Sequence, residues 1–274
     1  MSGSPRLIAT MPQSQSSPVH PTLIRSDIRY WRLGPDPRLP PSVLCSFVAM
    51  APPQGSAEFQ AREQELLLPD GHSELVFILS GGFERWPVGE EPMRRVMRPS
   101  YLIGGRSHSV LTRAIGELIV VGAKLDCRAL RSFIRTPLGE FRDGTLSLAE
   151  LNQRALLDLE DAIANAHSVE AIRASFDRFF LAAIRDVQRS DVAVSELLRR
   201  LRRERGALSI MEWMRDHRLD PRNFERRFCE WTGLPPKRYA RVIRFKHSYH
   251  RFISGARATH LDGYYDQSHF NREF

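Results

Sequence analysis

The spacing of apolar residues changes once along this chain, and that change limits the folds that it can adopt. Up to about residue 125, apolar residues form short runs or alternate with polar ones, as in Ser42–Met50 and Glu74–Leu79. This is the two-residue period of β-strands. After about residue 126 they recur every three or four residues, as amphipathic helices require. Strands followed by helices predict an α+β fold.

Turn residues divide the first half into several short predicted strands. Besides 42–50 and 74–79, the runs at 65–68, 83–86, 94–103 and 116–124 have strand character. The pair Gly81–Gly82 predicts a hairpin turn between two of them. Many short strands with turns between them indicate a β-rich barrel or sandwich.

The second half predicts three helices before the C-terminal region. Ser147–Glu150 has the pattern of a capping box, in which the serine hydroxyl and the glutamate each satisfy a free amide at the helix start. The apolar stripe that follows predicts one helix through Ile163. Further helices are predicted over Val169–Ala183 and Val192–Arg203. They show no reactive constellation, and we interpret them as a helical connector.

Composition and patterning together predict the domain organisation. Residues 1–20 are rich in Ser, Pro and Gln and lack the apolar core of a signal peptide, which predicts a disordered tail. We expect a β domain at 21–125, the connector at 126–200 and a C-terminal domain at 201–274. No apolar run is long enough for a membrane span. Three widely spaced cysteines, Cys45, Cys127 and Cys229, favour a reducing, cytoplasmic location.

The positive charge of the chain is concentrated near its C-terminus. The net charge is +8 overall, but residues 199–274 contain 18 Lys and Arg against 9 Asp and Glu, whereas the preceding residues contain 22 against 23. This asymmetry is typical of a polyanion-binding module attached to a near-neutral domain, although a solvated basic helical face would look the same.

Two short helices joined by a tight turn are predicted within this basic region. Ser209–Glu212 has a second capping-box pattern, and the helix that it opens ends at about Arg218. Asp220–Pro221 starts the next helix, because Asp accepts amide protons at the N-cap and Pro at the first helical position needs no donor. Phe224 and Phe228 lie on one face of that helix.

The opposite face of the second helix is rich in arginine. It carries Arg222, Asn223, Glu225, Arg226 and Arg227. Arginine pairs with two acceptors of guanine, asparagine pairs with adenine, and glutamate accepts a proton from cytosine. Residues 233–236 end this helix and start a long one through about Phe252, on which Lys237 is expected to meet phosphates. The arrangement predicts a helix-turn-helix.

Two stretches of the C-terminal region resemble the DNA-binding domain of AraC/XylS-type regulators. They are LDPRNFERRFCEWTGLPPKRYARVIRF, residues 219–245, and GYYDQSHFNREF, residues 263–274. The resemblance implies two helix-turn-helix units joined by a long central helix. It implies base contacts from Arg222, Glu225 and Arg226 in the first unit and places Gln267, Ser268, Asn271 and Arg272 at the matching positions of the second. Residues 69–79 and 137–141 are similar to the cupin-like N-terminal domain of one branch of the family.

The chain departs from the family pattern at several places. Arg218 stands where Gly is usual in the turn, and Met214 stands where a small Ala is usual. Residues 254–262 are short and polar where the first helix of the second unit is expected, and the chain ends at Phe274, within the second recognition helix.

The sequence therefore predicts a sequence-specific transcription regulator that reads the major groove, with no catalytic residues, metal or cofactor. Its expected partner is double-stranded promoter or operator DNA; a small-molecule effector and a second copy of the chain are further candidates, and a membrane is not. Two alternatives stay open. One is a metal-dependent cupin-like enzyme with a basic helical tail, for which His72, Glu74 and His108 are the candidate ligands. The other is a protein-interaction module with a degenerate helix-turn-helix.

Overall fold

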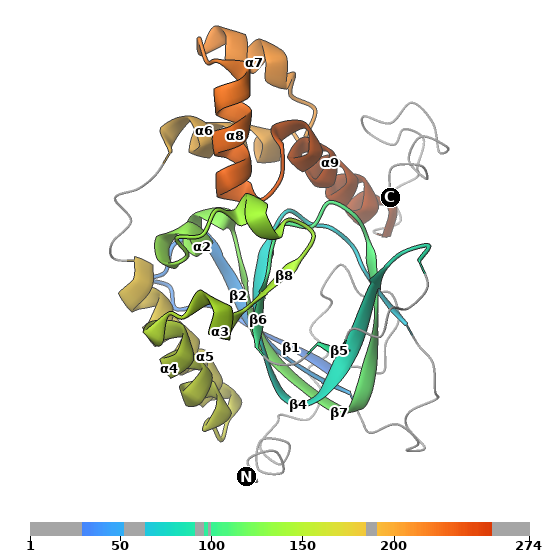
Figure 1. Cartoon of the computed structure of the whole chain (residues 1–274), viewed down its shortest axis with the longest axis vertical. Coiled ribbons are helices and arrows are strands. Elements are labelled where there is room, and N and C mark those ends of the chain that lie inside the picture. The colour runs from blue at the N-terminus through green and yellow to red at the C-terminus, as the bar shows by residue number, and fades with distance from the viewer. Residues whose placement is uncertain (1–28, 52–63, 91–95, 98–99, 185–190, 254–274) are drawn as a thin grey trace.

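The chain has the predicted α+β architecture, with an antiparallel sheet followed by helices (Figure 1). The computed structural model describes residues 29–51, 64–90, 96–97, 100–184 and 191–253. The described strands lie up to Leu125, except for one three-residue strand that follows the first of the described helices. The change of period in the sequence therefore coincides with the change from strand to helix.

All the described strands belong to one sheet. They are β1 (Arg29–Leu33), β2 (Val43–Ala51), β3 (Glu65–Leu67), β4 (Ser73–Pro87), β5 (Val96–Met97), β6 (Tyr101–Ile103), β7 (Val110–Leu125) and β8 (Thr145–Ser147). The order across the sheet is β1-β2-β7-β4-β6-β8, with β3 paired to β7 and β5 paired to β4. The sheet curls on itself, as Figure 1 shows, and does not consist of two separately packed layers.

The prediction of a hairpin turn at Gly81–Gly82 is wrong. Both glycines lie inside β4, which stays paired with β7 on either side of them. The register shifts between Ile78 and Gly82, so the glycines mark β-bulges. Gly81 has a φ of +69°, and a Cβ there would collide with the backbone of Glu117. A bulge bends a strand without ending it, and turn composition alone does not separate the two cases.

Alternating residues bury both faces of the sheet. In β2, Val48 contributes to a core shared with the helices, while its neighbour Phe47 contributes to a separate cluster on the other face. In β4, Phe77 lies on the helical side, 5.9 Å between ring centroids from Phe176, and Val76 lies on the other. This two-residue alternation gives the sheet one face for the helices and a second apolar face.

The helices follow in chain order. They are α2 (Cys127–Phe133), the short 3-10 helix η1 (Leu138–Phe141), α3 (Leu148–Leu151), α4 (Arg154–Ala164), α5 (Val169–Ala183), α6 (Val192–Arg203), α7 (Ile210–Asp216), α8 (Pro221–Thr232) and α9 (Pro236–Ile253). Among the residues described, no helix is both long and apolar enough to cross a membrane. In Figure 1, α4 and α5 lie beside the sheet, and α6 to α9 gather at one end of it.

Two predictions about helix starts need correction. The capping box at Ser147 is formed, but the helix that it opens ends at Leu151, because Asn152 adopts a left-handed conformation with φ +45° and α4 begins after it. The single predicted helix through Ile163 is therefore two. At the start of α7, Ser209 occupies the N-cap position without a side-chain hydrogen bond, so the second predicted capping box is not formed.

Replacing Phe224 by Ala is expected to destabilise the C-terminal helices. Phe224 is 1% exposed and its ring lies 5.4 Å from that of Trp213 and 6.0 Å from that of Phe228. Losing a buried phenyl ring costs about 3–5 kcal/mol of unfolding free energy. Urea unfolding followed by circular dichroism measures this loss. Met211→Ala, on the exposed side of α7, is the control and should change stability by less than about 0.5 kcal/mol.

Candidate DNA-binding surface

Helices α7 and α8 meet across a tight bend, as a helix-turn-helix requires. The amide of Leu219 donates to the carbonyl of Met214 at 3.0 Å, and Arg218 between the helices has a φ of +53°. This is the left-handed C-terminal cap that glycine usually provides, and a non-glycine residue adopts it at a cost of about 1–2 kcal/mol. The bend therefore forms with Arg218 in the position where the family has glycine.

The start of α8 forms as its sequence predicts. The carboxylate of Asp220 accepts the amide proton of Asn223 at 2.8 Å, and Pro221 is the first helical residue. The helix ends at Gly233, which has a φ of +82°. Phe224 and Phe228 are 1% and 0% exposed, so one face of α8 is fixed in the core.

The opposite face of α8 is open to solvent. Arg222, Asn223, Glu225 and Arg226 are all exposed. The guanidinium of Arg226 pairs with Glu230 at 2.6 Å and donates to the side-chain oxygen of Asn223 at 3.0 Å, yet the side chain stays 65% exposed. An exposed pair of this kind contributes no more than about 1 kcal/mol, so a stronger partner can displace it.

Arg227 is placed differently from its neighbours. Its guanidinium makes a bidentate ion pair with Asp191, with its closest contact at 2.6 Å, and it lies 5.9 Å above the ring of Phe224. Asp191 also caps the start of α6 by accepting from the amide of Val194. Arg227 therefore joins α8 to α6, and we do not include it among the proposed DNA contacts.

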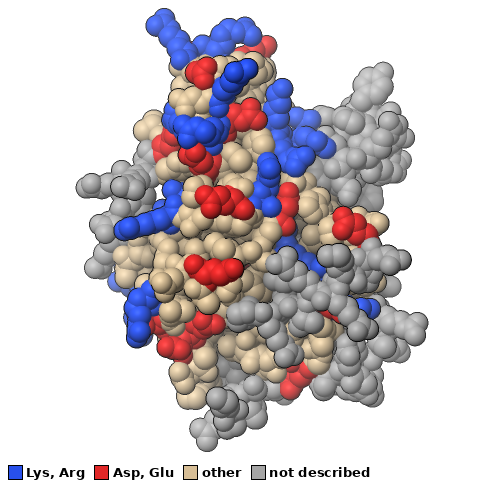
Figure 2. Space-filling view, viewed as in Figure 1, with Lys and Arg blue, Asp and Glu red and all other residues tan. Residues whose placement is uncertain are grey.

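Further cations surround the exposed face of α8. Lys237 and Arg238 are exposed in the first turn of α9, and Arg215 and Arg218 are exposed on the α7 side. Figure 2 shows Lys and Arg side chains gathered at the end of the molecule formed by α7 and α8 and alongside α9. In the sequence, Arg218 is only a departure from the pattern of AraC/XylS-type regulators, and no motif distinguishes Arg215. Their exposure beside α8 is visible only once the helices are placed.

The predicted contacts of the second unit, Gln267, Ser268, Asn271 and Arg272, lie outside the described residues. They stay predictions, as does the division of the chain at residues 20, 125 and 200. The candidate surface is therefore built from α7, α8 and the start of α9.

The C-terminal end of α8 packs against the loops of the sheet. Gly105 approaches so closely that a Cβ there would lie 2.8 Å from the carbonyl oxygen of Thr232, and one at Gly139 would lie 3.2 Å from the Sγ of Cys229. In Figure 1 the sheet and η1 lie at this end of α8 and α7 lies at the other. The first turn of α8, which carries Arg222 and Asn223, is therefore the part of the helix farthest from the sheet.

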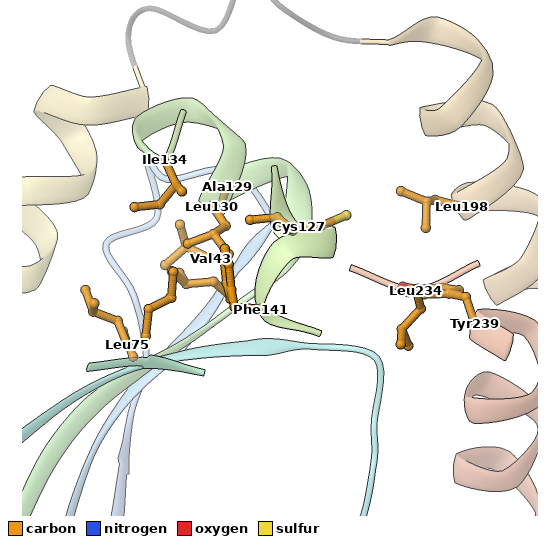
Figure 3. Close-up of a cluster of buried hydrophobic side chains, with 14 of the residues drawn as sticks. Val43, Leu75, Cys127, Ala129, Leu130, Ile134, Phe141, Leu198, Leu234 and Tyr239 are labelled. Carbon is orange, nitrogen blue, oxygen red and sulfur yellow. The ribbon is translucent and has the colours of Figure 1, made fainter. Parts of the chain in front are cut away.

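A buried polar network fixes this arrangement. Arg202 of α6 forms an ion pair with Asp126 at the end of β7, and it donates to the hydroxyl of Tyr239 at 3.0 Å. That hydroxyl donates in turn to the carbonyl of Gly71 at 3.4 Å. Around the network, apolar side chains from three segments, Cys127, Leu198 and Leu234, complete the junction (Figure 3).

Asp126 keeps its charge in this junction although it is only 2% exposed. Burial opposes ionisation, but the attraction of Arg202 and the hydrogen bonds from Arg128 outweigh it and lower the pKa of the carboxyl below its usual value. Because the pKa is lower in the folded protein than in the unfolded chain, this pair stabilises the fold above about pH 4 and loses its effect as the pH falls further.

Asp126→Asn should therefore destabilise the protein at neutral pH by about 3 kcal/mol, since it leaves Arg202 without a buried partner charge. The difference from the wild type should narrow between pH 5 and pH 3, as the unfolded wild-type chain begins to bind the proton. Urea unfolding across this pH range measures both effects. Asp158→Asn removes the exposed pair of Asp158 with Arg154 and should change stability by less than about 1 kcal/mol. A pH-independent difference for Asp126→Asn would contradict the assignment of a charged carboxylate.

The residues suggested for a metal site have separate partners. The ring of His72 lies 3.3 Å from Asp70, Glu74 lies 3.5 Å from both Arg106 and Lys124, and His108 lies 3.2 Å from Asp143. Within the described part of the chain, no group of three or more His, Cys, Asp or Glu side chains is arranged to hold a metal ion. The three candidates are therefore not brought together as a ligand set.

Comparison with known proteins finds similarity only among solved structures. No protein-family model and no curated protein sequence matches the chain. The crystal structure of ToxT from Vibrio cholerae O395 covers 90% of this chain and 91% of its own, with 13% identity and a TM-score of 0.39. A structure of ToxT from Vibrio cholerae in a P21 crystal form covers 92% of this chain and 93% of its own, with 12% identity and a TM-score of 0.40. These similarities are distant and carry no functional assignment for the surface.

Proposed function

We propose that this chain is a sequence-specific DNA-binding transcription regulator that inserts the first turns of α8 into the major groove. One observation carries the proposal. Phe224 and Phe228 are buried, and Arg222, Asn223, Glu225 and Arg226 are exposed on the other side of the same helix. This is the division of faces that a recognition helix needs, because one side must hold it to its own domain and the other must meet the bases.

Electrostatic attraction brings the duplex to this surface. Arg215, Arg218, Lys237 and Arg238 are exposed at the two ends of α8, where they are suited to contact phosphates. The excess of nine positive charges in residues 199–274 draws a polyanion to the helices and not to the sheet. These contacts position the protein on DNA without selecting a sequence.

Base recognition is assigned to the exposed residues in the first turns of α8. Arg222 makes no ion pair with another described residue, and Arg226 has only exposed partners on its own helix. Either guanidinium can form two hydrogen bonds with guanine, which supplies on the order of 1–3 kcal/mol of discrimination. Asn223 is suited to adenine and Glu225 to cytosine.

The remaining contacts follow from the resemblance of the sequence to AraC/XylS-type regulators. We propose that Gln267, Ser268, Asn271 and Arg272 meet a second segment of major groove. A small-molecule effector and a second copy of the chain are proposed partners on the same basis. Neither is needed for the proposed base recognition by α8.

Selection of genomic DNA fragments on the full-length protein tests the proposal. We expect a discrete set of enriched fragments that share a motif. A duplex carrying the motif should bind more tightly than its scrambled version in a fluorescence anisotropy titration. The logarithm of the binding constant should fall linearly with the logarithm of salt concentration, by about 0.9 for each phosphate contacted. Absence of enrichment, together with salt-independent binding of other proteins, would instead favour the protein-interaction module.

Replacing Arg226 by Ala should weaken binding to the selected motif by about 1–3 kcal/mol and relax the preference for one base pair. The melting temperature should change little, because the side chain is 65% exposed and its ion pair with Glu230 lies at the surface. Anisotropy titrations on a panel of single-base variants of the motif measure both the loss and the position that is relaxed.

Arg154→Ala is the matched control. Arg154 is also an exposed arginine paired four residues along its helix, with Asp158 at 2.8 Å, but it lies on α4 beside the sheet. It removes the same charge from the chain and should leave the affinity for the motif unchanged within about 0.5 kcal/mol. Equal losses for the two variants would show that net charge alone, and not the α8 surface, governs binding.

A further inference from the structure

Helix α6 makes a charged contact at each of its ends. At its start, Asp191 forms the ion pair with Arg227 of α8. In its last turn, Arg202 pairs with Asp126, directly after β7, and donates to the hydroxyl of Tyr239. Helix α6 crosses α8 at the end of the molecule that the C-terminal helices form (Figure 1). It therefore links the candidate recognition helix to the sheet.

The ion pair between Asp191 and Arg227 has a defined geometry. The Nε of Arg227 lies 2.8 Å from the Oδ2 of Asp191, and its Nη2 lies 2.7 Å from Oδ1 and 2.6 Å from Oδ2. Two parallel hydrogen bonds hold the plane of the guanidinium in line with the carboxylate, so the pair has a direction as well as a strength. The side chain of Asp191 is 11% exposed and that of Arg227 35%, so salt screens the pair less than it screens a surface pair.

Each partner is also held within its own helix. The carboxylate of Asp191 accepts the amide proton of Val194 at 3.1 Å, and its backbone carbonyl accepts that of Ser195 at 2.9 Å. The guanidinium of Arg227 lies 5.9 Å from the ring centroid of Phe224, which is buried. Because neither side chain can move away without losing these contacts, the pair fixes the distance and the direction between the start of α6 and the middle of α8.

The pair constrains α8 from the side. The close approaches of the sheet loops lie at the C-terminal end of the helix. The rings of Phe224 and Phe228 hold its inner face, and apolar contacts of this kind do not depend on direction. Arg227 follows Arg226 and lies about 100° from it around the helix, at 3.6 residues per turn. A bidentate contact at that position resists rotation of α8 about its axis.

We propose that Asp191 and Arg227 are positioning residues for base recognition. Their ion pair sets the direction in which α8 presents Arg222 and Arg226 to the floor of the groove, although neither partner touches DNA. This inference rests on the proposed function of α8 and adds to it a requirement on residues outside the DNA contacts. Phosphate contacts tolerate a small rotation of the helix, because charges attract one another over several ångströms, whereas two hydrogen bonds to one base do not. Loss of the pair should therefore reduce discrimination between sequences more than it reduces binding to DNA in general.

Two variants of the full-length chain test this role. Arg227→Met removes the guanidinium and keeps an unbranched side chain, and Asp191→Ser removes the carboxylate and keeps an N-cap hydroxyl for α6. In fluorescence anisotropy titrations, each should weaken binding to the selected motif by about tenfold, as the loss of one bidentate base contact would. Binding to the scrambled duplex should change by less than about twofold. The two losses should not add in the double variant, because both substitutions remove the same pair.

A direct phosphate contact by Arg227 would give a different result. Arg227→Met would then weaken binding to both duplexes and reduce the slope of log affinity against log salt concentration by about 0.9. Asp191→Ser would weaken neither, since it leaves the guanidinium free to meet the phosphate. That combination of results would overturn the positioning role.

Arg227→Lys separates the geometry of the pair from its charge. Lysine keeps the positive charge but cannot form the two parallel hydrogen bonds with Asp191. The positioning role predicts a loss of discrimination close to that of Arg227→Met, with the salt dependence of the wild type. Full motif binding by the lysine variant would overturn it, because charge alone would then be sufficient.

Arg113→Met is the matched control. Arg113 of β7 also forms an ion pair through two of its nitrogens, with Glu84, and lies 5.7 Å from the ring of Trp86. Its side chain is 38% exposed and that of Glu84 10%, close to the values for Arg227 and Asp191. The melting temperature should fall as it does in Arg227→Met, but both duplexes should bind within about twofold of the wild type. Loss of motif preference in both variants would assign the effect to reduced stability and overturn the proposal.

Hydrogen–deuterium exchange of the free protein separates this inference from the proposed function. The backbone amides of α8 should exchange faster in Arg227→Met and Asp191→Ser than in the wild type, because the helix is less firmly held, and should be unchanged in Arg113→Met. Equal exchange in all four proteins would overturn the positioning role even if α8 binds DNA as proposed. Absence of a selected motif in the wild type would instead refute the proposed function, and the exchange result would still decide whether the pair holds α8.

Discussion

The placement of the C-terminal helices depends on the contacts that the buried side chain of Tyr239 makes. Its side chain is 1% exposed, and its ring meets Phe228 edge-on at 5.7 Å. Its hydroxyl accepts from Arg202 at 3.0 Å and donates to the carbonyl of Gly71 at 3.4 Å. One residue thus belongs to the aromatic core of the helix-turn-helix, to the charged junction with Asp126 and to the loop that precedes β4. The exposed face of α8 has a defined direction because the buried face is held by this junction.

Much of the fold could be predicted because the period of apolar residues depends on local geometry. The start of α8 at Pro221 and the bounds of α6 agree with the sequence analysis, since a capping aspartate begins each helix. Gly81–Gly82 and Asn152 could not be placed in this way. A glycine pair serves a bulge as well as a turn, and a left-handed asparagine can interrupt an apolar stripe without changing its spacing. Whether a glycine pair forms a bulge or a turn, and whether a helix is interrupted, depends on the strand or helix that packs against the segment. The sequence of one segment carries no information about that partner.

In the candidate surface, too, local spacing predicts some side-chain positions, whereas others depend on tertiary contacts. The exposure of Arg222 and Arg226 follows from their position opposite Phe224, so helical spacing was sufficient to predict it. Arg227 occupies an intermediate position on the helix, and its direction is decided by Asp191, which is distant in sequence and adjacent only in the fold.

The anchoring of α8 at one end also determines how much room the proposed complex leaves for a duplex. The helix contains 12 residues, and at about 1.5 Å per residue it extends for about 18 Å from the sheet loops to Pro221. The major groove of B-DNA is only about 8.5 Å deep. A helix that enters the groove by its first turn therefore reaches the floor while its base, with the sheet behind it, is still outside the phosphate backbones. The length of α8 therefore acts as a spacer between the floor of the groove and the sheet loops.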